Sequence, residues 1–423
     1  MSNFVIKADF AYNKNINEIK TYKDSYLVCE DGVSKGIYKS LPKKYQDLKL
    51  YDYSNKLCIP GMIDLHIHAP QYAYRGLYMD EELLDWLNKY AFVEEGKYRN
   101  LKYADKAYDI FVNALKKSAT TRAAIFGTVH LKATLLLMEK MEKTGLISYV
   151  GKVNMNRNAP KYLLDSCEEA SIKDSISIIE AAKKYKRTKA IITPRFIPSC
   201  SNKLLKELGD LASKYEVPIQ SHLSENPGEI ENVHQLMPDI EFYGQGYAKY
   251  GLFGGNNKTI MAHCVYSSKE EVELMKENGV YIASCPSSNM NVRSGIAPIS
   301  SYIEKGLNVG LGSDVAGGES ESIFGEIKKA IEVSKLYNRL VDNDVKELSF
   351  PNAFYLSTIG GGKFFGKVGS FERGYELDAI VLNDEIEPHP QALNIQERLE
   401  RSVYLGVDKK GIVAKFVKGK KIY

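Results

Sequence analysis

The chain has 423 residues, of which 44% are hydrophobic and 26% are charged. This length supports a sizeable buried core, and the ordinary charged fraction argues against bulk disorder. The formal net charge of +4 is too weak to indicate a nucleic-acid partner. No apolar stretch approaches the roughly 18 residues of a membrane-spanning helix, so we expect no membrane partner.

The N-terminal residues and the cysteines bear on the location of the protein. Residues 1–15 contain no basic stretch followed by a long apolar core, so we expect no secretory signal. The six cysteines are scattered and never form a C-x-x-C pair. This spacing favours reduced thiols and a cytoplasmic location, and it excludes a structural zinc ribbon or finger.

Short strands are predicted at both ends of the chain. Residues 1–60 alternate apolar and polar residues between glycine-containing breaks, which is typical of a small antiparallel sheet. Residues 369–423 carry similar runs, such as LDAIVLND and GIVAKFV. We therefore predict a composite β-sandwich domain assembled from residues 1–60 and 369–423.

The middle of the chain, residues 61–368, alternates apolar β runs with amphipathic helical stretches. The β runs are MIDLHIH, AAIFGTV, YVGKVNM, AIITPRF, PIQSHLS, TIMAHCV, VYIASCP and LNVGLGSD. Eight strands, most of them followed by a helix, predict an α/β fold of the (β/α)8 TIM-barrel type. In such a barrel the catalytic groups lie at the carboxyl ends of the strands.

Histidines and carboxylates occur at four of these predicted strand ends. His66 and His68 point to the same face, because side chains alternate along a strand. Two further strands end in His222 and His263, and another ends in Asp314. Imidazoles with a carboxylate suit a divalent cation, so we predict a metal site there.

Glu225 lies three residues after His222 and is a candidate base for the mouth of the barrel. The alternative is a surface glutamate that opens the next helix. His130 ends another β run, and we expect it to pack or bond locally rather than line the pocket.

At these residues the chain resembles the amidohydrolase superfamily, and within it the branch that deaminates guanine. PGMIDLHIH at 60–68 matches the opening motif of the superfamily, and MAHC and GLGSD continue the match. TPRF, QSHLSEN and DVAGG are similar to the guanine branch. The sequence departs from the family at Ser284, where histidine is common, and at Lys363, where small residues are common.

The resemblance implies a ligand set and a mechanism. One zinc ion would be held, with iron as the alternative, and the absence of a lysine from TPRF supports a single metal. A zinc-bound hydroxide would attack guanine at C2, with His263 and Asp314 as further catalytic residues and Glu225 as the proton shuttle. The residues that would ligate the ion are His66, His68, His222 and Asp314.

The substrate would be guanine, whose Hoogsteen edge shows two acceptors, N7 and O6. Arg195 offers a matching fork of donors, Gln71 can donate and accept, and Phe196 is a candidate stacking surface. His68 and His222 would also contact the substrate. The alternatives are a surface salt bridge for Arg195, a loop position for Gln71 and a core position for Phe196.

Two rival functions remain open on the sequence. One is another amidohydrolase reaction, such as deamination of a different heterocycle, hydrolysis of a ring amide or dechlorination of a triazine. The other is a non-catalytic binding protein, which would be expected to lack a ligand or the acid–base residue. We also expect a homodimer that acts in purine catabolism, as is frequent in this family.

Overall fold

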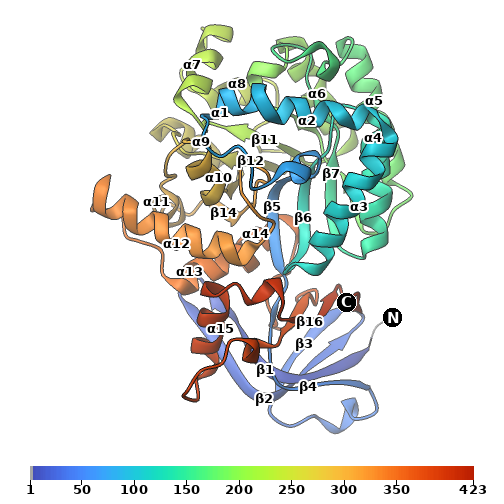
Figure 1. Ribbon diagram of the computed structural model, residues 1–423, viewed down its shortest axis with the longest axis vertical. Helices are drawn as coiled ribbons and strands as arrows, with labels where there is room; N and C mark the ends of the chain where they lie inside the picture. The colour runs from blue at the N-terminus through green and yellow to red at the C-terminus, as the bar shows by residue number, and fades with distance from the viewer. Residues whose placement is uncertain (1–2) are drawn as a thin grey trace.

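Eight parallel strands form the part of the molecule that carries the predicted site (Figure 1). The computed structural model, which describes residues 3–423, arranges them as two four-stranded sheets. They match the eight predicted β runs, so the α/β class is confirmed. The first sheet contains β5 (Met62–His68), β6 (Thr120–Phe126), β7 (Ile147–Gly151) and β9 (Thr188–Ala190), and the second contains β11 (Ile219–Leu223), β12 (Thr259–His263), β13 (Tyr281–Ser284) and β14 (Asn308–Leu311).

The two four-stranded sheets approach each other at both of their edges. A parallel bridge joins Ile192 to Ile219, close to the short pair β8 (Val153–Asn154) and β10 (Thr193–Pro194). On the other side, the backbone N–H of Asp314 donates to the carbonyl of His66 at 2.8 Å. Between residues 3 and 423 no continuous ladder joins β14 to β5, so closure into a barrel stays a prediction.

The strands form because they are buried on both faces. Every residue of β5, β6, β11 and β12 is buried, as is usual where helices cover a parallel sheet. Side-chain caps start several of the covering helices, and Asn100 accepts from the backbone N–H groups of Lys102 and Tyr103. The helices of 14 residues or more are α3 (Leu101–Lys117), α4 (Leu131–Thr144), α5 (Glu168–Ala182), α6 (Asn202–Tyr215) and α12 (Ile323–Leu340), and the shorter α9 (Lys269–Glu277) follows β12.

Short helical segments lie over the carboxyl ends of the strands (Figure 1). After β5 the chain forms η2 (Ala69–Tyr74) and then the nearly continuous run α1 (Leu83–Trp86), η3 (Leu87–Ala91) and α2 (Phe92–Gly96). From later in the chain, α7 (Pro227–Leu236), α8 (Tyr243–Ala248) and α10 (Pro286–Asn291) follow β11 and β13. Of these segments, η2, α1, η3 and α10 contribute residues to the wall of a pocket above the strand ends.

Strands from both ends of the chain share one seven-stranded sheet. Its members, in spatial order, are β17 (Lys420–Lys421), β16 (Ile412–Val417), β15 (Ala379–Leu382), β4 (Lys49–Pro60), β1 (Phe4–Asn15), β2 (Glu18–Glu30) and β3 (Val33–Tyr38). The expectation that this sheet is antiparallel is wrong for β1 and β4, which pair in parallel. The reason is that residues 39–48 carry the chain from the edge strand β3 across to β4. The sandwich and its domain limits stay predictions.

The sequence analysis did not foresee α15 (Ile395–Tyr404), which packs beside β1 and β2. A capping box starts this helix, since Asn394 accepts from the N–H of Glu397 and the Glu397 side chain accepts from the N–H of Asn394. The N-x-x-E spacing was the available signal.

Buried charges join the seven-stranded sheet to the parallel strands. Arg122 of β6 donates to both carboxylate oxygens of Asp378, at 2.7 and 3.1 Å, and also to Glu376 at 2.9 Å. Lys415 of β16 is buried and donates to the carbonyls of Lys116 and Thr120 at 2.7 and 2.9 Å. A bidentate arginine–carboxylate pair fixes geometry as well as energy.

Replacing Arg122 with methionine should destabilise the protein strongly, because Asp378 would stay buried without its ion-pair partner. The expected loss is about 3–5 kcal/mol of unfolding free energy, measured by denaturant or thermal unfolding. The control is Lys206→Met, which removes an exposed pair with Asp210 and should cost less than about 1 kcal/mol. Equal unfolding midpoints for both variants would contradict the importance of the Arg122 pair.

Candidate active site

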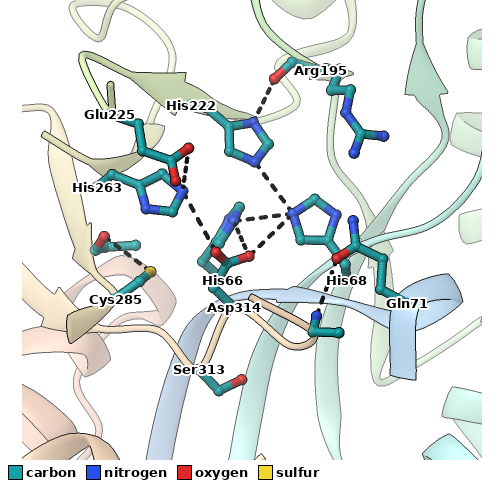
Figure 2. A network of polar contacts seen from close by, with 12 residues as sticks. His66, His68, Gln71, Arg195, His222, Glu225, His263, Cys285, Ser313 and Asp314 are labelled. Atoms are coloured by element: carbon teal, nitrogen blue, oxygen red, sulfur yellow. Dashed lines mark hydrogen bonds and ion pairs between the residues drawn. The ribbon is translucent and has the colours of Figure 1, made fainter. Parts of the chain in front are cut away.

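Side chains from four strand ends meet at one point, as Figure 2 shows. His66 and His68 come from β5, His222 comes from β11, and His263 is the last residue of β12. Asp314 follows the end of β14 and is buried like the four histidines. The structure thus brings together all the residues that the sequence predicts as metal ligands, with His263 beside them.

The backbone turns sharply where two of these side chains enter the cluster. His263 has φ of 75° and Asp314 has φ of 43°, both in the left-handed region that non-glycine residues seldom adopt. Such conformations persist only where the surroundings hold them and are frequent at functional sites. For Asp314 the surroundings include the backbone hydrogen bond to His66.

Ring nitrogens and one carboxylate approach one another closely within the cluster. The Nε2 atom of His68 lies 3.2 Å from Nε2 of His66 and 3.3 Å from Nε2 of His222. The Oδ1 atom of Asp314 lies 3.1 Å from His66 Nε2 and 3.4 Å from His68 Nε2. Ligands about 2.0–2.1 Å from a tetrahedral ion would lie about 3.4 Å from one another, so these spacings suit one ion.

The protonation of the rings also suits a cation. Burial lowers the pKa of His66, His68 and His222, so these imidazoles stay neutral and keep a lone pair for an ion. His222 Nδ1 donates to the carbonyl of Arg195 at 2.6 Å, which leaves its Nε2 lone pair facing the cluster.

Asp314 supplies the negative charge of the cluster. Burial by itself raises the pKa of this carboxyl, but the imidazoles of His66, His263 and His68 outweigh it and hold the pKa well below its usual range. Three neutral nitrogen donors with one carboxylate form a set that binds zinc and other divalent transition metals. The residues present therefore fit a metal ion, as the sequence predicts, although the donor set does not specify which one.

A buried carboxylate that the sequence analysis did not single out supports the ligands from behind. Asp64 accepts from the N–H and the hydroxyl of Ser313, at 3.0 and 2.6 Å, and from the N–H of His66 at 3.2 Å. It therefore ties the backbone before Asp314 to the backbone of β5. Asp64 lies inside the PGMIDLHIH motif, but the motif does not show which atoms it holds.

Glu225 lies at the edge of the cluster rather than on the surface. Its Oε2 atom is 3.4 Å from Nε2 of His263, and its Oε1 atom accepts from the hydroxyl of Ser294 at 3.2 Å. Burial raises the pKa of Glu225 well above its usual value, and the nearby charge of Asp314 adds to the shift. Figure 2 shows Glu225 and His263 on one side of the cluster. The surface alternative for Glu225 is wrong.

Two more residues, which the sequence did not point to, hold Glu225 and His263 in place. The N–H of Glu225 donates to the carboxylate of Glu229, one helical turn further on, at 3.1 Å. His263 Nδ1 bonds to the Asn289 side-chain oxygen at 2.8 Å, so that Nε2 of His263 faces Glu225. Both supports depend on contacts between separate segments, which the sequence does not show.

A pocket opens above the cluster and reaches the short helices that follow β5. Trp86 contributes its indole to the wall, and its Nε1 atom is buried without a hydrogen-bond partner in the described residues. The residues that line the pocket are His68, Gln71, Leu83, Trp86, Leu87, Arg195, Phe196, His222, Glu225, His263, Ser288, Val292 and Asp314.

All five predicted substrate residues line this pocket, namely Gln71, Arg195, Phe196, His68 and His222. Arg195 is buried and donates from Nη1 to Glu95 at 2.7 Å, so the surface alternative for Arg195 is wrong. Gln71 is also buried, donates to Glu95 at 2.8 Å and accepts from the N–H of Ala316 at 3.1 Å. Phe196 lies at the pocket with its ring centre 6.5 Å from that of His222.

The positions where the sequence departs from its family lie away from the ligands' side chains. Ser284 ends β13, and its carbonyl accepts from the N–H of Gly312 at 2.8 Å. Lys363 lies in α14 (Gly361–Phe365) and is exposed. His130 precedes α4 and does not line the pocket, as expected from the sequence.

Comparison with known proteins shows the family to which the chain belongs. Residues 57–422 match the amidohydrolase family, and the chain belongs to that family. It is 39% identical over 381 residues to the guanine deaminase of Mus musculus, covering 86% of this chain and 82% of that protein. The guanine deaminase of Escherichia coli strain K12 is 35% identical over 385 residues, covering 89% and 85% of the two chains.

Solved structures agree with these relatives. A guanine deaminase from C. acetobutylicum with guanine bound in its active site superposes with a TM-score of 0.96 at 45% identity, covering 100% of both chains. Triazine hydrolase from Arthobacter aurescens, at 16% identity and a TM-score of 0.81, shares the fold alone. Across residues 3–423, no helix has the length and apolar character that crossing a bilayer would require.

Replacing Asp64 with alanine should weaken metal binding, because Ser313 and His66 would lose the acceptor that holds them. The expected loss of affinity is about 10–100-fold, as for other residues that support metal ligands, measured by competition with a chelator of known affinity. The control is Asp210→Ala on the exposed face of α6, which should bind metal as tightly as the wild type. Unchanged affinity in the Asp64 variant would contradict this role.

Proposed function

We propose that this protein hydrolyses guanine to xanthine and ammonia with one divalent ion, which we infer to be zinc. The observation that carries the proposal is that His68, His222 and Asp314, with His66 in contact with them, border a pocket that also contains Glu225 and Arg195. The guanine-bound relative at 45% identity supports the choice of substrate. We also infer that the two parallel sheets close into a (β/α)8 barrel and that the enzyme works in the cytoplasm as a homodimer.

The substrate-facing groups match the edges of a purine with an oxygen at C6. Arg195 uses one N–H on Glu95 and keeps others for the acceptors N7 and O6. The Gln71 amide keeps one N–H and one lone pair beyond its bonds to Glu95 and Ala316. Phe196 offers a ring face for stacking. The base is therefore held at its edges by hydrogen bonds and on its plane by Phe196.

The ligands of the ion are His66, His68, His222 and Asp314, with His68 and His222 also bordering the substrate. A bound divalent ion lowers the pKa of coordinated water from 15.7 to about 7. Glu225 takes the proton from the water that attacks C2 and delivers it to the amino group that leaves as ammonia. Its raised pKa lets it hold that proton between the two transfers.

His263 and Asp314 act with Glu225 on the attacking water. Asn289 fixes the proton of His263 on Nδ1, so the Nε2 lone pair is available to orient the water. Since Glu225 takes one proton of the water, the second can be held by Nε2 of His263 or by Oδ2 of Asp314, which lies 3.8 Å from that nitrogen. The two groups therefore direct a lone pair of the oxygen towards C2.

The substrate proposal is tested by ammonia release from guanine, adenine and cytosine under the same conditions. Guanine should be the preferred substrate, with adenine slower by a factor on the order of 10⁴ or more, because adenine carries no amine at C2 and its C6 amine opposes the donors of Arg195. Ammonia release from adenine or cytosine at the rate for guanine would contradict the proposal and favour another amidohydrolase reaction. No turnover of any of them would favour a binding protein.

Changing Glu225 to glutamine should abolish ammonia release while metal stays bound, because the amide has the same shape but cannot carry the proton. Rates and metal content should be measured on the same preparation. Glu231→Gln is the matched control, since Glu231 lies on the exposed face of α7 and should leave the rate unchanged. Full activity in Glu225→Gln would refute the shuttle role.

A further inference from the structure

Glu95 is a buried carboxylate behind the wall of the pocket. It lies in α2 with 1% of its surface exposed and does not itself line the pocket. Its two oxygens serve different residues, since Oε1 accepts from Gln71 at 2.8 Å and Oε2 accepts from Arg195 at 2.7 Å. A buried charge is costly unless it is paired, so this arrangement ties Glu95 to two pocket residues.

The neighbouring Glu94 does not share the contacts that Glu95 makes with Arg195 and Gln71. Glu94 is also buried, but its carboxylate bonds to Lys97 at 2.6 Å and to the hydroxyl of Tyr103. Of two adjacent glutamates on one short helix, only Glu95 contacts the groups that face the substrate. The same helix supplies Phe92, whose ring lies 5.0 Å from the guanidinium carbon of Arg195.

The two hydrogen bonds to Glu95 fix which donor and acceptor atoms of Arg195 and Gln71 face the pocket. An amide can turn to exchange its oxygen and nitrogen, but Gln71 is held with its nitrogen on Glu95 and its oxygen on the N–H of Ala316. Arg195 is held by the hydrogen bond from its Nη1 atom to Glu95 and by the contact of its guanidinium with the ring of Phe92. Figure 2 shows Arg195 and Gln71 on the side of the cluster where His68 lies.

We propose that Glu95 is a positioning residue that sets specificity for a purine with an oxygen at C6, by fixing the donors of Arg195 and the amide of Gln71 together. This inference rests on the proposed deamination of guanine. With the carboxylate in place, the donors of Arg195 meet a C6 oxygen and oppose a C6 amine. The carboxylate also balances the charge of Arg195, which suits an uncharged base.

The test is the variant Glu95→Gln, assayed with guanine and with 2,6-diaminopurine. Both purines carry the amine at C2. They differ at C6, which bears an oxygen or an amine, and with it at N1, which bears a proton only in guanine; chromatography separates the products of reaction at the two carbons. Glutamine keeps one acceptor and places an NH2 where the second acceptor was, so Arg195 or Gln71 loses its bond. The matched control is Glu94→Gln in the same turn of helix.

We expect kcat/KM for guanine to fall about 10–100-fold in Glu95→Gln, mainly through KM, since a buried donor is left unpaired. The preference for guanine over 2,6-diaminopurine at C2 should narrow by about tenfold or more, because the fixed donor pattern is lost. Metal content should not change. Glu94→Gln should keep the wild-type preference.

Each other outcome has a defined meaning. A wild-type preference in Glu95→Gln overturns the inference, as does an equal loss on both purines accompanied by loss of metal. If Glu95→Gln does not fold, Glu95→Asp takes its place, since it keeps the charge with a shorter reach, and an unchanged preference there overturns the inference. A wild-type enzyme that does not act on guanine refutes the proposed function itself, and the inference with it.

Discussion

Parallel strands deliver the side chains at their carboxyl ends to a common edge, and here that constraint places nitrogen donors and a carboxylate within contact distance. His68 and His222 are 154 residues apart in the chain, yet their Nε2 atoms are 3.3 Å apart. Packed so closely and away from water, these atoms cannot all satisfy one another as neutral groups. A shared cation resolves the conflict, and so the fold itself creates the demand for a metal.

A second pattern repeats around this cluster, because three buried carboxylates hold residues of the cluster and of the pocket from behind. Asp64 holds the backbone on both sides of the ligand set, Glu95 holds Arg195, and Glu229 holds the backbone of Glu225 and accepts from Tyr243 at 2.7 Å. Each of the three has at least two donors, as buried acceptors require. The side chains of the cluster and of the pocket wall are thereby held in place by the protein itself.

The sequence predicts well the residues that form the cluster and line the pocket. It predicts poorly the residues that hold them from behind. Strand-end histidines are recognisable, because a run such as MIDLHIH shows both the buried strand and the residues at its end. Glu95 follows Glu94 in a short helical stretch, and nothing local shows which of the two faces the pocket. The parallel pairing of β1 with β4 was missed for the same reason, since it depends on how the chain crosses a sheet.

The shared seven-stranded sheet has a consequence for how the chain reaches its native state. Beside the β4–β15 pair, Lys56 bonds to Asn383 at 2.9 Å across 327 residues of sequence. During synthesis β4 therefore stays without its partner β15, with one edge open, until all eight parallel strands have been made. Open edges pair readily with other chains, so this edge is where a stalled or shortened product would begin to aggregate.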